Sequence, residues 1–170
     1  MRSLVVYESM FGNTRAVAEA IAEGLRGDVG VVEVGAAPHE LASDIDLLVL
    51  GAPTHAFGMS RAATREDAAQ RAVAANTALV SRHGGMREWV ERVRVPSHVR
   101  LAVFDTKIAK PRLPGSAAKG VAKRLRGAPV ELVAAVQHFL VVDTLGPLAD
   151  GEFDRAREWG TTLSERVPVR

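Results

Sequence analysis

The stretch that decides the fold runs from residue 4 to residue 14 and reads Leu4-Val5-Val6-Tyr7-Glu8-Ser9-Met10-Phe11-Gly12-Asn13-Thr14. Its first four residues are apolar and rich in β-branched side chains, which is typical of a parallel strand buried on both faces. A short turn follows, and then apolar residues at helical spacing, Val17, Ile21 and Leu25. The stretch therefore predicts a strand, a tight turn and a helix that begins near Asn13 and ends near Arg26.

The turn between that strand and that helix has the composition of an anion-binding site. Ser9 and Thr14 supply hydroxyl donors, and Gly12 lets the backbone approach a ligand closely. The helix that follows presents unpaired N–H groups and the positive end of its dipole to the turn. These features predict a phosphate site, although ordinary capping of the helix by Asn13 or Thr14 would explain the same residues.

The rest of the sequence alternates apolar runs with helical segments, as α/β proteins do. Further strands are expected at residues 31–34, 47–51, 101–104 and 132–142, the last one broken around Gln137 and His138, and further helices at residues 86–93, 116–126 and 152–166. The stretch 61–81 has no clear apolar stripe and is expected to be an exposed, partly helical connection. Five strands interleaved with helices predict a three-layer α/β/α sandwich around a parallel sheet, with residues 1–170 forming a single domain.

Composition excludes several classes of protein. The chain has 170 residues and no cysteine, which excludes a disulfide scaffold, a thiolate nucleophile and cysteine-ligated metal. No apolar run approaches the ~20 residues that cross a bilayer, and the first one is too short for a signal peptide. We therefore expect a cytoplasmic protein that does not bind membranes. The formal net charge of +2 gives it no general affinity for nucleic acid.

The turn resembles the phosphate loop of the flavodoxin family, which reads roughly Ser/Thr-x-Thr-Gly-x-Thr. Ser9, Gly12 and Thr14 match this pattern, whereas Phe11 replaces the middle threonine and removes one side-chain hydrogen bond to phosphate. The resemblance implies a flavodoxin-like fold with five parallel strands in the order 2-1-3-4-5. It also implies that the cofactor is FMN.

Two later segments resemble the same family in the correct order. Residues 51–54, Gly-Ala-Pro-Thr, are similar to the Gly-x-Pro-Thr that opens the flavin-contacting loop, and residues 146–160 resemble the final loop and helix. By this resemblance, the expected cofactor-binding residues are Ser9, Met10, Phe11, Gly12, Asn13, Thr14, Pro53, Thr54, His55, Ala56, Phe57, Gly58, Asp105, Thr106 and Lys107. The plane of His55 or Phe57 is expected to cover the flavin ring. No acid–base pair, nucleophile–base pair or metal-ligand spacing is visible, so no catalytic or metal-binding residue is predicted.

A basic stretch follows the fourth expected strand. Between Thr106 and Val130 there is no acidic residue, and the basic ones are Lys107, Lys110, Arg112, Lys119, Lys123, Arg124 and Arg126. A solvated helix face would explain the stretch. Alternatively, residues 107–126 bind an acidic redox partner protein or the phosphates of a nicotinamide nucleotide. A lysine close to the flavin would stabilise its anionic reduced form, so we expect a less negative potential than in acidic flavodoxins.

Three functions remain open at this point. The first is an FMN-binding flavoprotein that mediates electron transfer and has no substrate of its own. The second is an FMN-dependent NAD(P)H:quinone-type oxidoreductase. The third is a flavodoxin-like scaffold that has lost FMN.

Overall fold

The computed structural model describes residues 1–111 and 114–167. Its elements, in chain order, are β1 (Arg2–Tyr7), α1 (Asn13–Gly24), β2 (Asp28–Glu33), the 3₁₀ turn η1 (Val34–Ala36), β3 (Leu47–Pro53), α2 (Ala62–Ala74), α3 (Met86–Val90), β4 (Arg100–Ile108), α4 (Ala117–Arg124), the 3₁₀ turn η2 (Leu125–Gly127), β5 (Glu131–Leu132), β6 (Gln137–Val141) and α5 (Glu152–Arg166).

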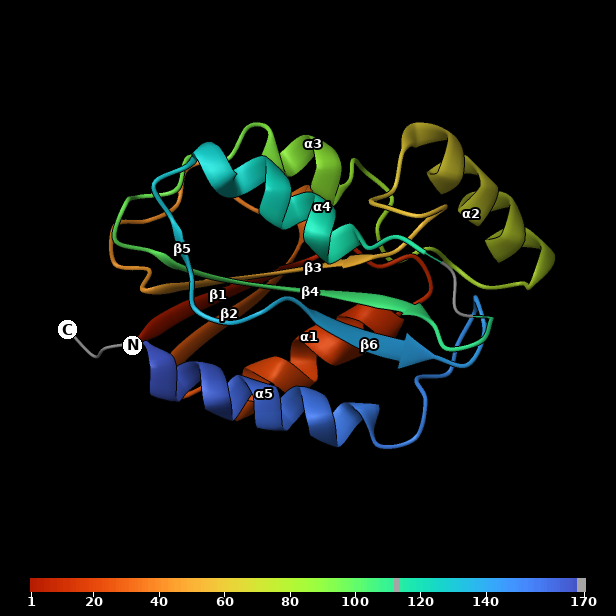
Figure 1. The fold of residues 1–170 in the computed structure, drawn as a ribbon. Helices are drawn as coiled ribbons and strands as arrows, with labels where there is room; N and C mark the ends of the chain where they lie inside the picture. Colours follow the sequence, from red (N-terminus) through yellow and green to blue (C-terminus); the bar gives the residue numbers. More distant parts are fainter. Residues whose placement is uncertain (112–113, 168–170) are drawn as a thin grey trace.

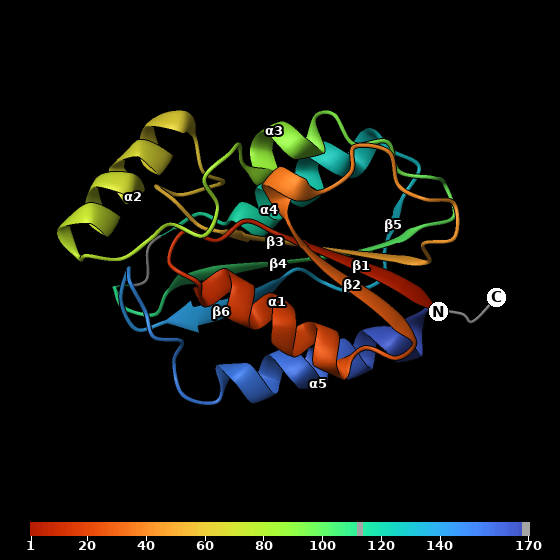
Figure 2. The same cartoon turned by 180° about the vertical axis from the view of Figure 1, so that it is seen from behind.

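The strands form a parallel sheet in the order β2-β1-β3-β4-β5, and β6 pairs with β4 further along the same edge. Helices α1 and α5 cover one face of the sheet, and α3 and α4 cover the other (Figure 1). The same three layers are seen from behind in Figure 2. The structure thus confirms the predicted α/β/α sandwich and its strand order.

Side chains of the central strands alternate between the two faces of the sheet and build a core on each side. Val5 and Phe104 belong to the core under α1 and α5, which also includes Trp159. Val6 and Val103 belong to the core under α3 and α4. All four strand residues are fully buried, which explains why these strands read as continuous apolar runs rather than as an alternating pattern.

One expectation about the elements needs correction. The last strand is broken, but the break lies at residues 133–136, and Gln137 and His138 begin β6 instead of interrupting it. The connection 61–81 is partly helical and mostly exposed, as expected, and its helix α2 has 13 residues, of which Ala68 and Ala72 are buried. This helix does not lie on a face of the sheet but beyond the carboxyl ends of the strands (Figure 1). In the described part of the chain, no helix is both long enough and apolar enough to cross a membrane.

Candidate functional site

A cavity of about 280 Å³ lies at the carboxyl ends of β1, β3 and β4. The chain turns from β1 to β2 in one direction and from β3 to β4 in the other, so the cavity lies where ligands bind in open α/β sheets. It is lined by Ser9, Met10, Phe11, Asn13, Thr14, Pro53, Thr54, His55, Ala56, Thr64, Asp67, Ala68, Arg71, Thr106, Lys107, Ile108, Val141 and Thr144. Its volume is close to the lower end of the ~300–1,000 Å³ of small-molecule sites.

The loop from Ser9 to Thr14 forms one wall of this cavity. Gly12 is the N-cap of α1 with φ 94°, a conformation that favours glycine, and no side chain of a described residue caps the helix. The first N–H groups of α1 therefore have no partner within the helix. The Gly12 N–H donates to the Ser9 hydroxyl at 3.1 Å, which leaves the Ser9 proton available to a ligand. The start of α1 and the Ser9 hydroxyl therefore present hydrogen-bond donors at the place where the sequence predicts a phosphate site.

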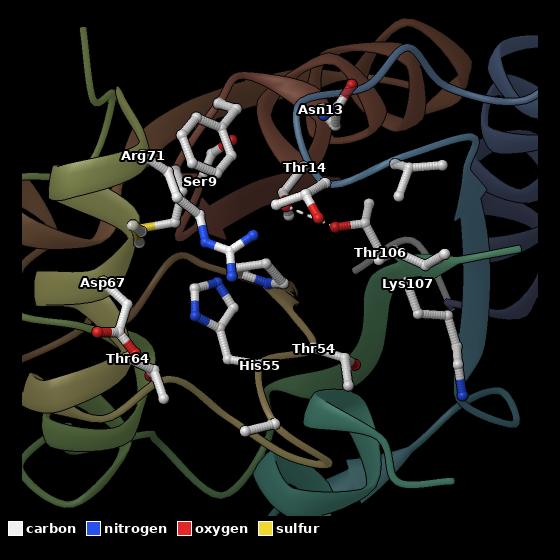
Figure 3. A pocket seen from close by; sticks show the side chains of 18 residues that line it. Ser9, Asn13, Thr14, Thr54, His55, Thr64, Asp67, Arg71, Thr106 and Lys107 are labelled. Atoms are coloured by element: carbon white, nitrogen blue, oxygen red, sulfur yellow. Dashed lines mark hydrogen bonds between the residues drawn. The ribbon is translucent and has the colours of Figure 1, made fainter. Parts of the chain in front are cut away.

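Thr14 is fixed by an unexpected partner on the neighbouring strand. Its hydroxyl lies 2.7 Å from the hydroxyl of Thr106, and both side chains are buried. Figure 3 shows this hydrogen bond at the edge of the cavity. Because one hydroxyl has one proton and two lone pairs, Thr14 can accept from Thr106 and still donate to a ligand.

A segment that the sequence did not single out supports the loop from outside. The Ser9 N–H donates to the hydroxyl of Ser81 at 3.0 Å, and the N–H groups of Val80 and Ser81 donate to the carbonyls of Met10 and Ser9. Ser81 is buried. The end of the connection 61–81 therefore holds the phosphate loop in place.

The second expected loop turns tightly next to the cavity. His55 and Gly58 exchange two backbone hydrogen bonds of 2.7 and 2.9 Å around Ala56 and Phe57, which have φ angles of 40° and 76°. His55 and Ala56 line the cavity, whereas Phe57 lines a smaller neighbouring hollow and is 60% exposed. Burial lowers the pKa of the His55 imidazole, and the charges of Arg65 and Arg71 lower it further. A hydrogen bond with the backbone of Thr64 raises this pKa and offsets only part of the decrease.

Thr54 and Asp105 connect loops behind the cavity wall. The Thr54 hydroxyl donates to the Asp105 carboxylate at 3.1 Å, so its proton is not available to a phosphate in this arrangement. Asp105 is fully buried and also accepts from the Ser116 hydroxyl and the Ala118 N–H, while His138 Nδ1 lies 2.7 Å from its other oxygen. Asp105 is absent from the cavity lining. Its carboxylate instead joins β4, β6 and the start of α4.

The basic stretch begins at the cavity and then leads away from it. Lys107 lines the cavity, and its Nζ donates to the carbonyl of Gly115 at 2.9 Å. Lys119 and Lys123 are exposed on α4, which runs from the cavity end of the sheet toward the opposite end (Figure 1). Arg112 lies outside the described residues. Only the first part of the stretch is therefore adjacent to the site.

Helix α2 contributes a wall of the cavity that the sequence reading missed. Thr64, Asp67, Ala68 and Arg71 all line the cavity and fall on one face of the helix. The arginine points from α2 into the space between Ser9 and His55 (Figure 3). Because these residues are mostly polar, they show no apolar periodicity in the sequence. Only their spacing of three and four residues indicates that they share one face of a helix.

A buried carboxylate connects α2 to the phosphate loop. Glu8 directly precedes Ser9, is fully buried, and accepts hydrogen bonds from the Ser60 hydroxyl and, at 2.7 Å, from the Met86 N–H. Arg65 of α2 donates to the same Ser60 hydroxyl at 2.9 Å and pairs with Glu88 at 2.9 Å. Burial raises the pKa of Glu8, and the hydrogen bonds and the charge of Arg65 only partly offset this rise.

The residues present fit a flavin mononucleotide. The uncapped start of α1 and the hydroxyls of Ser9 and Thr14 provide donors for a phosphate. The cavity is also lined by His55, whose pKa burial lowers, and by the apolar side chains of Ile108 and Val141, which suit a flat ring. Among residues 1–111 and 114–167 there is no group of three side chains that could hold a metal ion.

Comparisons with known proteins agree with this description. Residues 4–65 match the model of a flavodoxin domain family. Comparison with curated protein sequences gave no match. Flavodoxin 1 from Bacillus cereus is 16% identical with a TM-score of 0.70, covering 99% of this chain and 100% of that one. A flavodoxin from the domain Archaea is 20% identical with a TM-score of 0.62, covering 98% of both chains.

A third similar structure is a WrbA-like flavodoxin from Agrobacterium tumefaciens, which is 17% identical with a TM-score of 0.57 and covers 96% of this chain and 95% of that one. At these identities the structural likeness establishes the fold. The chain therefore has a flavodoxin-like fold, and its residues 4–65 match the model of a flavodoxin domain.

Proposed function

We propose that the protein binds FMN in this cavity and acts as an electron-transfer flavoprotein. The observation that carries the proposal is the uncapped N-terminus of α1, which opens into the cavity beside the hydroxyls of Ser9 and Thr14. Such a terminus binds anions without a charged side chain. When bound, FMN supplies one- and two-electron redox chemistry.

The protein's own residues would position the cofactor and tune its surroundings. Ser9 and the first N–H groups of α1 would hold the phosphate, and Thr106 would orient the hydroxyl of Thr14 toward it. His55 would present a neutral ring to the flavin, because burial keeps its pKa low. Lys107 would supply positive charge near the ring and so favour the reduced cofactor.

A visible spectrum of the purified protein, recorded with and without added FMN and after desalting, tests this proposal. We expect a flavin spectrum that stays with the protein fraction at about one FMN per chain. A colourless protein that does not retain added FMN would contradict it and would favour a scaffold that has lost the cofactor.

The basic start of the stretch 107–126 favours a second candidate, an FMN-dependent NAD(P)H:quinone-type oxidoreductase. Lys110 is exposed two residues after the cavity-lining Ile108, where the phosphates of a nicotinamide nucleotide could bind. Anaerobic mixing of the FMN-loaded protein with NADH or NADPH separates the two candidates. Rapid loss of the flavin absorbance would support the reductase. A stable spectrum would leave a protein redox partner as the electron donor, docked on the same basic surface.

A further inference from the structure

Helix α2 places a cation inside the cavity without giving it a partner. Arg71 lines the cavity, and no hydrogen bond or ion pair joins its guanidinium to any residue in the described part of the chain. Asp67 lies one turn earlier on the same helix, at the i−4 position where an acidic side chain often pairs with arginine. That pair is not formed within 4 Å, and Arg71 points into the space between Ser9 and His55 (Figure 3). The guanidinium therefore faces the cavity with its donors free.

The residues around Arg71 present mainly hydrogen-bond donors. The start of α1 and the hydroxyl of Ser9 face the cavity from the opposite wall. His55 lies close enough for the Arg71 charge to lower its pKa, in addition to the larger effect of burial. Among the residues that the structure describes, Asp67 is the one carboxylate that lines this cavity. These donors suit an anion, because hydrogen bonds from a guanidinium to phosphate oxygens are stronger than those between neutral groups.

The position of Arg71 relative to the phosphate loop is fixed by buried contacts. Arg65, six residues earlier on α2, donates to Ser60, and Ser60 donates to Glu8, the residue directly before Ser9. Arg65 also pairs with Glu88 of α3. Gly85 lies so close to this network that a Cβ there would collide with the Arg65 guanidinium. Helix α2 is therefore held at a set distance from the loop, which is what preorganised binding requires.

We propose that Arg71 is a ligand of the flavin phosphate, which it binds from the side opposite the N-terminus of α1. This inference rests on the proposed binding of FMN and adds a charged ligand to the neutral cradle. Phe11 of the loop offers no hydrogen bond, whereas a guanidinium donates up to two parallel ones to phosphate oxygens. The phosphate would lie between α1 and α2, and its charge would offset that of Arg71 next to His55.

Binding of three probes to the apoprotein tests the role of Arg71. The probes are FMN, riboflavin, which lacks the phosphate, and inorganic phosphate. For Arg71→Gln, we expect the Kd of FMN to rise roughly ten- to a hundredfold and the Kd of riboflavin to stay within about twofold. Arg71→Lys keeps the positive charge but loses the planar guanidinium that can donate two parallel hydrogen bonds. Its Kd for FMN should therefore lie between those of the unmodified protein and Arg71→Gln. Arg126→Gln is the matched control: Arg126 is exposed beyond α4, and its loss changes the net charge equally.

His55 provides a second readout that does not depend on the flavin. Binding of inorganic phosphate should raise the pKa of the His55 imidazole, measured by NMR, and Arg71→Gln should weaken that binding. Unchanged FMN affinity in Arg71→Gln, or an equal loss of affinity for FMN and riboflavin, would contradict the proposed role of Arg71. Either result would leave the binding of FMN by the unmodified protein unaffected. An equal loss in Arg126→Gln would also contradict the role of Arg71. Failure of the unmodified protein to bind FMN would overturn the proposed function as well.

Discussion

The hydroxyl oxygens of Thr14 and Thr106 lie 2.7 Å apart in the interior and connect the first turn of α1 to β4. Replacing one of them by valine leaves the other hydroxyl buried without its partner, which costs about 1–3 kcal/mol of unfolding free energy. Replacing both residues leaves no buried hydroxyl without a hydrogen-bond partner at this position. We therefore predict that Thr14→Val/Thr106→Val loses less stability than the two single variants added together, as measured by urea unfolding of the apoprotein in a double-mutant cycle.

The exposed-side hydroxyl of Thr162, which donates only to the carbonyl of Glu158 within its own helix, provides the control for this cycle. Thr162→Val should change the unfolding free energy by less than about 0.5 kcal/mol. Strictly additive losses at Thr14 and Thr106 would mean that the two hydroxyls do not depend on each other.

Glu8 should make stability depend on pH. Burial raises its pKa in the folded state, so the folded protein binds this proton more tightly than the unfolded chain does. Its contribution is therefore present at low pH and is lost as the pH rises from the ordinary carboxyl range through the raised pKa. Glu8→Gln should flatten the decline in unfolding free energy as the pH rises above the ordinary carboxyl range. Urea unfolding at a series of pH values measures the effect, with exposed Glu165→Gln as the control. Parallel curves for the two proteins would rule out a titrating Glu8.

Asp67 should oppose anion binding in the same cavity that Arg71 favours. Its carboxylate lines the cavity and forms no ion pair with another described residue. Asp67→Asn removes a negative charge at nearly constant shape, so the Kd of FMN should fall about two- to fivefold, most clearly at low salt. The Kd of riboflavin should not change. Isothermal titration at two salt concentrations measures both, and weaker binding of FMN would show that Asp67 binds the cofactor rather than repelling its phosphate.

The turn at Ala56 and Phe57 combines backbone strain with exposure. Two-residue turns with positive φ at both positions favour Asn-Gly, and other residues pay about 1–2 kcal/mol each for this conformation. The double variant Ala56→Asn/Phe57→Gly should therefore unfold at a higher urea concentration. If the ring of Phe57 covers the flavin, the same variant should bind FMN more weakly. Stabilisation without loss of FMN affinity would leave His55 as the aromatic contact.

Lys107 should raise the reduction potential of the bound cofactor. It lines the cavity, and a cation near the flavin stabilises the reduced, more negative form. Lys107→Gln should shift the midpoint potential to more negative values by tens of millivolts, whereas exposed Lys123→Gln on α4 should not. A spectroelectrochemical titration measures both variants, and equal potentials in all three proteins would show that Lys107 lies too far from the ring to act.

The parallel sheet could be predicted from the sequence because buried parallel strands leave continuous apolar runs such as Leu47–Leu50, whereas the strand order followed from the resemblance to flavodoxins. The loop from Ser9 to Thr14, which lines the cavity, could be singled out because glycine and hydroxyl residues stand at the end of the first strand. Helix α2 could not be assigned to the site, since a helix that covers a cavity instead of the sheet needs little apolar surface. The carboxylates gave no local signal either, because Asp105 and Glu8 acquire their roles only from partners far away in the sequence.

The relative affinity of the apoprotein for FMN and for riboflavin, which lacks the phosphate, tests the central claim most directly. Titration of the apoprotein with FMN and with riboflavin, followed by the quenching of flavin fluorescence, gives both affinities in one buffer. The account predicts one FMN per chain with a Kd at least about tenfold lower than that of riboflavin, since the phosphate contributes most of the polar contacts. Equal affinities, or no binding of FMN, would contradict it.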